Sequence, residues 1–349
     1  MRAYGPRGFR FQRREVKSPT GVWFLKASRK FLVVVAAVYG GSAAGIGCLY
    51  LYTTWKLERV QPIPSDWSFK QKLLGLAGVN HHMDERHDMV VKYYEDLINQ
   101  LVLDKNGNVI DLDTKTPAWL SGYADIAIRL GLSKDALGQT DDAIRALESG
   151  LSVPYGQKAL KAQAATVLSR IKVAQDKLKE AEQLSEESAG YTGIQMGRSR
   201  SGGMLVQDDK SPSTGEEIEA LTQLAKVYVK QKRLNDALNL LLGVQKRVKK
   251  LEEDSKCYEA VTMSYIAEVL WGLGQKKDAI VWGEGSYYNA FPNSRGTPEC
   301  GLCAKIAAGN LSTMYKKVDE EQSSKFKHLS ETQIIPLAVH KKSLFSSLL

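Results

Sequence analysis

Three segments of the chain repeat one pattern of large apolar, small and polar positions at helical spacing. They span residues 124–154, 218–248 and 260–292, and they align on three small anchors, Ala143, Ala237 and Ala279. Twelve and thirteen residues before each anchor stand a small and a large aliphatic residue, in the pairs Leu130–Gly131, Leu224–Ala225 and Ile266–Ala267. Glycine precedes the anchor by five residues in two segments, at Gly138 and Gly274. The pattern predicts two antiparallel helices per segment, with small residues where they cross and a left-handed residue where the first helix ends.

A hairpin of two helices about every 34 residues is the tetratricopeptide pattern. Weaker units flank the three segments at residues 67–101, 168–188 and 300–318, which makes about five or six units in all. We therefore predict an all-α tetratricopeptide solenoid over residues 64–318, following one N-terminal transmembrane helix. Residues 319–349 are expected to form a capping helix and a tail.

Two stretches lack the period. Residues 101–119 are rich in Asn, Asp and Gly, and we expect a loop or short hairpin between units. Residues 188–217 are rich in Ser and Gly, and we expect a mobile insertion.

The basic character of the chain is concentrated at its start. The chain carries 48 Lys and Arg against 39 Asp and Glu, and residues 1–30 hold nine of these bases and one acid. Since the remainder is nearly neutral, a nucleic-acid-binding face is not expected. An Arg-rich arm that is almost free of acids is typical of a mitochondrial targeting segment.

Residues 31–55 contain no charged side chain. A helix of this length spans about 37 Å, which is enough to cross a hydrocarbon core of about 30 Å. We predict a transmembrane helix there and a linker at residues 56–63. Gly41 and Gly45 form a GxxxG pattern that suits packing against a partner helix in lipid.

The arm and the span together predict a single-pass protein of the mitochondrial inner membrane. The asymmetry of Lys and Arg would keep the N-terminus in the matrix and the repeat body in the intermembrane space. The alternative is the outer membrane, with the body in the cytosol.

Enzyme and metal motifs are missing from the sequence, so we expect no catalytic residue, cofactor, metal site or small-molecule substrate. Residues 104–115 begin like a calcium loop, but Val109 and Lys115 stand where Gly and a bidentate acid are required. His81, His82 and His87 are interpreted as surface or packing residues. Cys300 and Cys303 form a CxxC without a second pair, and we interpret them as small buried thiols.

Protein partners are the expected ligands, because stacked hairpins present a curved surface lined by their first helices. The repeat register places a polar and aromatic set on the inner side of these helices. The predicted partner-binding residues are Arg129, Gln223, Lys226, Tyr265, Glu268 and Trp271.

The basic arm, single span and repeat body, with PAWLSGYADIAIRLGLSKDALGQTDDAI and PECGLCAKIAAGNLSTMY, resemble the fungal tetratricopeptide adaptor subunit of the mitochondrial inner-membrane i-AAA protease. This resemblance implies a non-catalytic protein that binds unfolded or surplus membrane proteins and presents them to the protease in quality control. Outer-membrane import receptors share the layout, but Ile128, Leu132 and Gln223 stand where their Lys and Asn clamp is expected. An assembly factor for a respiratory complex is a further alternative.

Overall fold

The computed structural model describes residues 41–42, 45, 47–48, 51–52, 54–103, 109–199, 201–207, 212–251, 255–295 and 297–335, in two units that meet after Lys56. The predicted arm of residues 1–30 and most of the predicted span lie outside the described residues. Those residues of the span that are described are helical, Gly41 and Gly45 included. Among the helices described, none is both long enough and apolar enough to cross a bilayer. The span and its packing role stay predictions.

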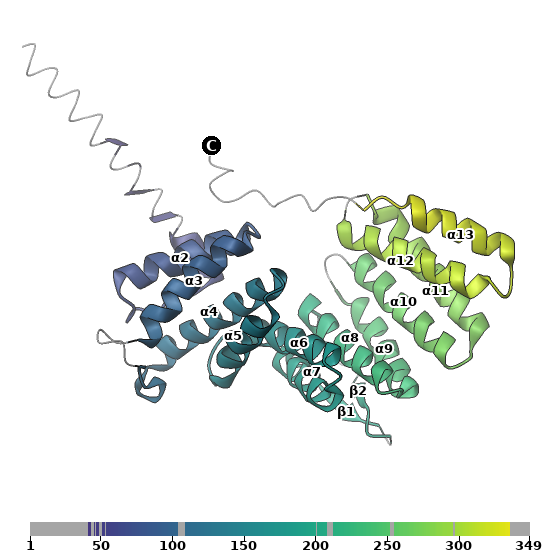
Figure 1. Ribbon diagram of the computed structural model, residues 1–349, viewed down its shortest axis with the longest axis horizontal. Coiled ribbons are helices and arrows are strands. Elements are labelled where there is room, and N and C mark those ends of the chain that lie inside the picture. Colours follow the sequence, from purple (N-terminus) through teal and green to yellow (C-terminus); the bar gives the residue numbers. More distant parts are fainter. Residues whose placement is uncertain are drawn as a thin grey trace, which may run out of the picture. The chain divides into compact units, whose positions relative to one another are not determined.

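From Leu57 onward the helices are joined two by two (Figure 1). In chain order they are α2 (Phe69–Met83) with α3 (His87–Val102), α4 (Pro117–Ala136) with α5 (Thr140–Ser152), α6 (Lys158–Ala174) with α7 (Leu178–Thr192), α8 (Gly215–Lys230) with α9 (Leu234–Val248), α10 (Ser255–Gly272) with α11 (Lys276–Ala290), and α12 (Pro298–Tyr315) with α13 (Glu320–Thr332).

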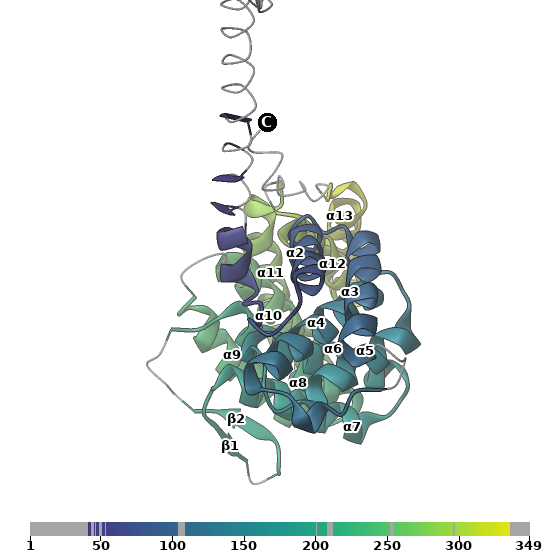
Figure 2. The ribbon, with the colours of Figure 1, turned by 90° about the vertical axis from the view of Figure 1, so that its left-hand side faces the viewer.

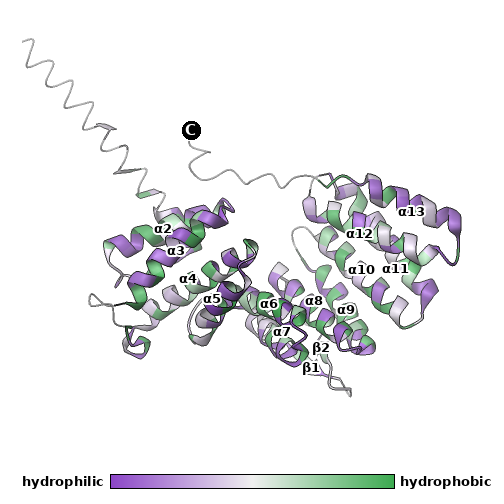
Figure 3. Cartoon of the chain, viewed as in Figure 1, coloured by the Kyte–Doolittle hydropathy of each residue, from purple (hydrophilic) through white to green (hydrophobic). Residues whose placement is uncertain are grey.

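The hairpins stack in chain order, because each second helix packs against the first helix of the next pair. The first helices α4, α6, α8, α10 and α12 also contact one another in succession, so they form one layer. We call the surface of this layer that faces away from the second helices the inner face. Along each helix, apolar positions alternate with polar ones, as expected where one side packs and another meets water (Figure 3). The predicted all-α solenoid is confirmed.

One turn geometry recurs in five of these hairpins. Five residues before each buried anchor stands a residue with positive φ, and these residues are Glu85, Gly138, Asp176, Lys232 and Gly274. In each case the next N–H donates to a carbonyl five residues earlier, as Gln139 does to Lys134 and Gln275 does to Leu270. This is the hydrogen bond of a Schellman motif, which ends a helix through a left-handed residue. The predicted role of Gly138 and Gly274 is confirmed, with φ of +75° and +81°.

Small residues mark the points where the two helices of a hairpin cross. A Cβ on Gly131 would lie 2.5 Å from Cγ of Leu147, and one on Gly150 would lie 2.6 Å from Cγ1 of Ile128. The anchor Ala143, one turn before Leu147 on α5, is fully buried. The alternation of large and small residues in the sequence therefore sets how closely α4 and α5 approach.

Lys232→Gly is expected to stabilise the protein by about 1 kcal/mol. Lys232 has a φ of +63° and is exposed, and a side chain in this region costs roughly 1–2 kcal/mol that glycine avoids. The midpoint of urea unfolding should rise. Lys230→Gly is the matched control, because Lys230 lies in the last turn of α8 and glycine there should lower the midpoint.

Residues 57–67, which we call the docked segment, differ from the predicted linker. Leu57, Gln61 and Trp67 are each at most 5% exposed. The side chain of Gln61 donates to Asp125 and accepts from Nε of Arg129 at 2.9 Å, and the carbonyl of Val60 accepts from Arg129 Nη2 at 3.4 Å. The segment thus lies against α4 instead of running free, because these buried polar groups need partners.

The region of residues 188–217 also differs from the predicted mobile insertion. Helix α7 continues to Thr192, and β1 (Met196–Arg198) pairs antiparallel with β2 (Met204–Val206). This β-hairpin lies beside α9, where Gly243 makes room for Val206 (Figure 2). The N–H of Met204 donates to the Tyr228 hydroxyl at 2.9 Å, which fixes the hairpin to α8. The sequence did not predict this β-hairpin, because a short strand contains only a few apolar residues and so shows little hydrophobic periodicity.

Residues 101–119 contain an isolated antiparallel bridge between Leu103 and Val109, followed by the short helix η1 (Leu112–Thr114). A second short helix, η2 (Phe291–Asn293), follows α11. The predicted capping helix is present as α13, whose Phe326 is fully buried. The predicted tail beyond Ile335 lies outside the described residues.

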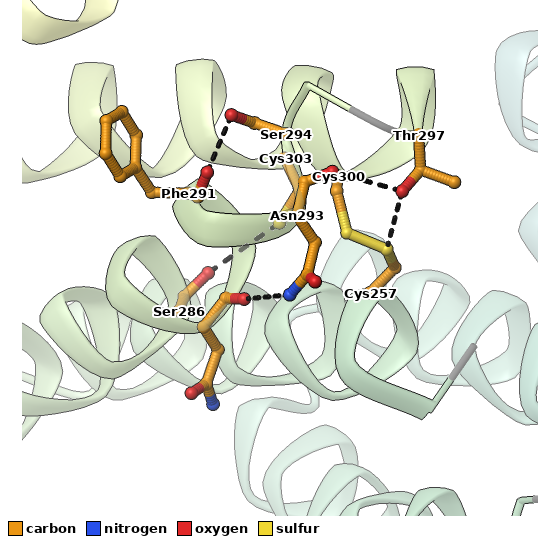
Figure 4. The surroundings of a disulfide bond; sticks show 9 residues. Cys257, Ser286, Phe291, Asn293, Ser294, Thr297, Cys300 and Cys303 are labelled. Carbon is orange, nitrogen blue, oxygen red and sulfur yellow. Dashed lines mark hydrogen bonds between the residues drawn. A yellow bond between two sulfur atoms is a disulfide. The ribbon is translucent and has the colours of Figure 1, made fainter. Parts of the chain in front are cut away.

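A disulfide joins Cys257 at the start of α10 to Cys300 at the start of α12 (Figure 4). The two Cα atoms are 5.1 Å apart, within the usual range for a disulfide. The prediction of a buried thiol at Cys300 is therefore wrong, because stacking brings together two cysteines 43 positions apart in the sequence. Cys303 is a buried thiol as predicted, with its sulfur 3.8 Å from the Ser286 hydroxyl.

Candidate partner-binding surface

Two of the six predicted partner-binding residues are buried by this chain's own contacts. Arg129 is 5% exposed and is bound to the docked segment, and Gln223 is 6% exposed and donates to Ser169 Oγ at 3.4 Å. Their register on the inner side was read correctly, but neighbouring elements cover them. We remove both from the candidate surface.

Lys226, Tyr265 and Glu268 lie together on the inner face of α8 and α10. The Lys226 ammonium lies 4.7 Å from the centroid of the Tyr265 ring, a cation–π contact between neighbouring hairpins. Glu268 is exposed and accepts a hydrogen bond of 2.7 Å from the Asn310 side chain of α12. These contacts hold the three side chains in place at the surface, so they form the centre of the candidate site.

A second carboxylate, Glu219, stands on α8 near its start and accepts a hydrogen bond of 3.4 Å from the Tyr258 hydroxyl. Partial removal from water raises the pKa of Glu219, and the same cause raises the pKa of Glu268. Lys226 acts on both in the opposite direction through its charge. The two acids thus share one cation.

Trp271, the sixth predicted residue, is half-buried at the end of α10. It packs against the apolar cluster formed by α8 to α11, and the Lys276 ammonium lies 5.6 Å from its ring centroid. Its role in binding stays a prediction, and we place it at the margin of the candidate surface.

Sequence analysis missed two apolar residues on α12. Leu302 and Ile306 are 48% and 47% exposed, and they follow the four-residue spacing that also includes Asn310. Residues at this spacing share one side of a helix, so the stripe runs beside Glu268. The signal was present in PECGLCAKIAAGN, where the small and buried residues of α12 leave these two larger ones on the opposite side.

The first helices of the last three hairpins run side by side in one direction. Tyr258 meets Glu219 and Tyr265 meets Lys226 between α8 and α10, while Cys257 is bonded to Cys300 and Glu268 meets Asn310 between α10 and α12. We call the resulting surface the C-terminal inner surface; it consists of Glu219, Lys226, Tyr265, Glu268, Leu302 and Ile306.

His81, His82 and His87 lie at the turn between α2 and α3. His81 stacks on Tyr93 with ring centroids 5.3 Å apart. Within the described ranges, no group of three or more His, Cys, Asp or Glu side chains is arranged to hold a metal ion. Burial raises the pKa of the Cys303 thiol and so disfavours its reactive thiolate form.

Acid is expected to destabilise the protein through His82. Burial, aided by the charges of Arg129 and His87, lowers the pKa of His82 to about 4. Below about pH 6.5, His82 is protonated in the unfolded state but not in the folded state. The free energy of unfolding therefore falls by up to about 3 kcal/mol by pH 4. Urea unfolding of His82→Leu should show a flatter pH dependence, whereas His328→Gln, at an exposed position of α13, should leave it unchanged.

No protein-family model and no curated protein sequence matches the chain. Among solved structures, BtubC from P. vanneervenii superposes with a TM-score of 0.50 at 11% identity, over 76% of this chain and 97% of that one. Cut9–Hcn1, an APC/C hetero-tetramer, gives 0.50 at 14%, over 86% of this chain and 45% of that one. A putative kinesin light chain from Podosopora anserina with TPR-like repeats gives 0.46 at 15%, over 66% and 100%.

At these identities the similarity concerns the fold alone. The similarity to BtubC and to Cut9–Hcn1 agrees with the repeated helical hairpins described above. The same helix-ending turn occurs at the same spacing in five hairpins, and the α12–α13 pair follows them. The body of this chain is therefore an all-α solenoid of the tetratricopeptide type.

Proposed function

We propose that the chain is a membrane-tethered adaptor of the mitochondrial inner membrane that binds protein substrates and presents them to the i-AAA protease. The observation that carries the proposal is the C-terminal inner surface. It combines ordered polar groups with exposed aliphatic side chains on three parallel helices, which suits an extended protein segment.

The docked segment supports a tethered body. It begins at Leu57, the residue that follows Lys56 and the predicted span in the sequence, and Leu57 is already buried on the solenoid. A short tether holds an adaptor near the membrane, where membrane-protein substrates and the protease would meet.

The Cys257–Cys300 disulfide supports a body on the non-cytosolic side. Disulfides persist in oxidising compartments and are rare in the cytosol. This favours the inner-membrane arrangement over an outer-membrane receptor that faces the cytosol. In intact mitochondria, added protease should leave the body uncut, whereas an outer-membrane receptor would be clipped.

Affinity purification in mild detergent, followed by mass spectrometry, tests the proposal. The tagged chain should recover the AAA protease, and substrates of that protease should turn over more slowly without the chain. Leu302→Asp with Ile306→Asp should reduce substrate recovery, whereas Val281→Asp should not, because Val281 is 65% exposed on the second helix α11, away from the inner face. Recovery of a respiratory assembly intermediate in place of the protease would contradict the proposal.

A further inference from the structure

The inner face already binds one segment of this chain, which is helical up to Val60 and irregular from Gln61 to Trp67. The docked segment presents the carbonyl of Val60 to Arg129 and Gln157, and the Gln61 amide bridges Asp125 and Arg129. Pro64 packs where Gly122 lacks a side chain. The inner positions of α4 from Gly122 to Arg129 are therefore covered by this chain itself.

One corresponding position farther along the solenoid is open, although Gln223, which corresponds to Arg129, is buried. Asp125 of α4 corresponds in the repeat to Glu219 of α8, and Leu132 corresponds to Lys226. Asp125 is 2% exposed and hydrogen-bonded to the docked segment, whereas Glu219 is exposed. Glu219 is thus open to a partner segment at the repeat position that residues 57–67 cover in α4.

The charge of this open surface is unbalanced. Glu219, Glu268 and the neighbouring Glu216 contribute three negative charges, against one positive charge on Lys226, whose ammonium also contacts the Tyr265 ring. The two carboxylates are held by one hydrogen bond each, from Tyr258 and Asn310, and both donors are neutral.

Apolar surface adjoins these acids on both flanks. Leu302 and Ile306 form a stripe on α12, and Val229 is 38% exposed near the end of α8. Aliphatic groups of a partner would gain by covering them, at roughly 25 cal/mol per Å² of apolar area removed from water. A partner that also brings a cation would neutralise the acids as they lose contact with water.

We propose that the C-terminal inner surface selects extended protein segments in which apolar residues alternate with lysine or arginine. The proposal rests on the proposed adaptor function and names its substrate class. Opposite charges set which segments are accepted and how fast they bind, while the apolar contacts supply most of the affinity. Acidic segments are excluded by repulsion from Glu219 and Glu268.

Peptide binding to the full chain in nanodiscs of phosphatidylcholine tests this selection. Three peptides with a neutral dye share the same Leu, Phe and Ala positions and differ only in carrying Lys, Ser or Glu between them. Fluorescence anisotropy should show the Lys peptide binding at least about tenfold more tightly than the Glu peptide at low salt, with a smaller difference at high salt.

Glu219→Gln with Glu268→Gln should weaken the Lys peptide about five- to tenfold and change the Ser peptide less than twofold. The matched control is Glu331→Gln, an exposed acid on α13, which should leave all three affinities unchanged. Glu219→Lys with Glu268→Lys should reverse the preference toward the Glu peptide. A variant that had lost its fold would bind none of the peptides, so the reversal distinguishes a change of charge from a loss of folding.

Equal binding of the three peptides, no binding of any of them, or an unchanged preference in the Gln variant would overturn the inference. The adaptor function is judged separately, because co-purification with the AAA protease is measured without peptides. A chain that recovers the protease but does not prefer basic segments would retain the function and lose the proposed substrate class.

Discussion

Glu217→Leu is expected to lower the free energy of unfolding by about 3–5 kcal/mol, since it leaves the Arg247 guanidinium buried with its carboxylate partner removed. Glu217 at the start of α8 receives two hydrogen bonds from Arg247 near the end of α9, from Nε at 2.6 Å and from Nη2 at 2.8 Å. Both side chains are at most 5% exposed. The pair joins the open end of the α8–α9 hairpin, and urea unfolding followed by circular dichroism measures the loss.

The double variant Glu217→Leu/Arg247→Met tests whether the loss of stability comes from the buried charge of Arg247. Replacing both charges by apolar side chains removes the burial cost together with the attraction, so much of the stability should return. Glu186→Ala is the matched control, because its ion pair with Arg198 at 3.0 Å is partly exposed and its loss should cost under about 1 kcal/mol. A loss as large in the double variant as in the single one would show that shape, and not charge, governs this site.

Reduction of the Cys257–Cys300 disulfide is expected to destabilise the C-terminal hairpins by about 4 kcal/mol, because the bond closes a loop of 43 positions in the unfolded chain. Helices α10 and α12 should separate more readily, and amide hydrogens of α12 and α13 should exchange faster. Hydrogen-exchange mass spectrometry with and without a reductant measures the effect, and Cys300→Ser should reproduce it without a reductant.

Thiol counting provides an independent check of the disulfide. The denatured chain holds four cysteines, and two of them, Cys48 and Cys303, should react before reduction and all four afterwards. Cys48→Ser is the control variant, since an exposed thiol outside the disulfide should not alter exchange in α12. Four reactive thiols without reduction would show that the bond is not formed in the purified protein.

The hairpins were predictable because their determinants are local. The distance of five residues between a helix-ending residue and a small anchor is a property of consecutive residues, and it recurs from Gly138 to Gly274. The same turn at Lys232 was less visible in the sequence, because the residue with positive φ there is not glycine. The fold class could therefore be inferred from the five-residue spacing alone, whereas a turn formed by a residue other than glycine, as at Lys232, could not.

The candidate site was predicted in part. Lys226, Tyr265 and Glu268 face the surface expected from their register, but Arg129 and Gln223 occupy equivalent positions and are covered. Register specifies the side of a helix to which a residue belongs. It does not specify what packs on that side, and for Arg129 the covering segment begins 72 residues earlier, at Leu57.

Local periodicity thus determined the helices, their pairing and the layer of first helices, because side chains three and four residues apart must share one face. Contacts between distant residues decided the rest. The docked segment covers one part of the inner face, and the β-hairpin packs on α9. A disulfide joins Cys257 of α10 to Cys300 of α12. Each depends on where stacking places residues far apart in the chain, and that placement follows from the packing of whole helices.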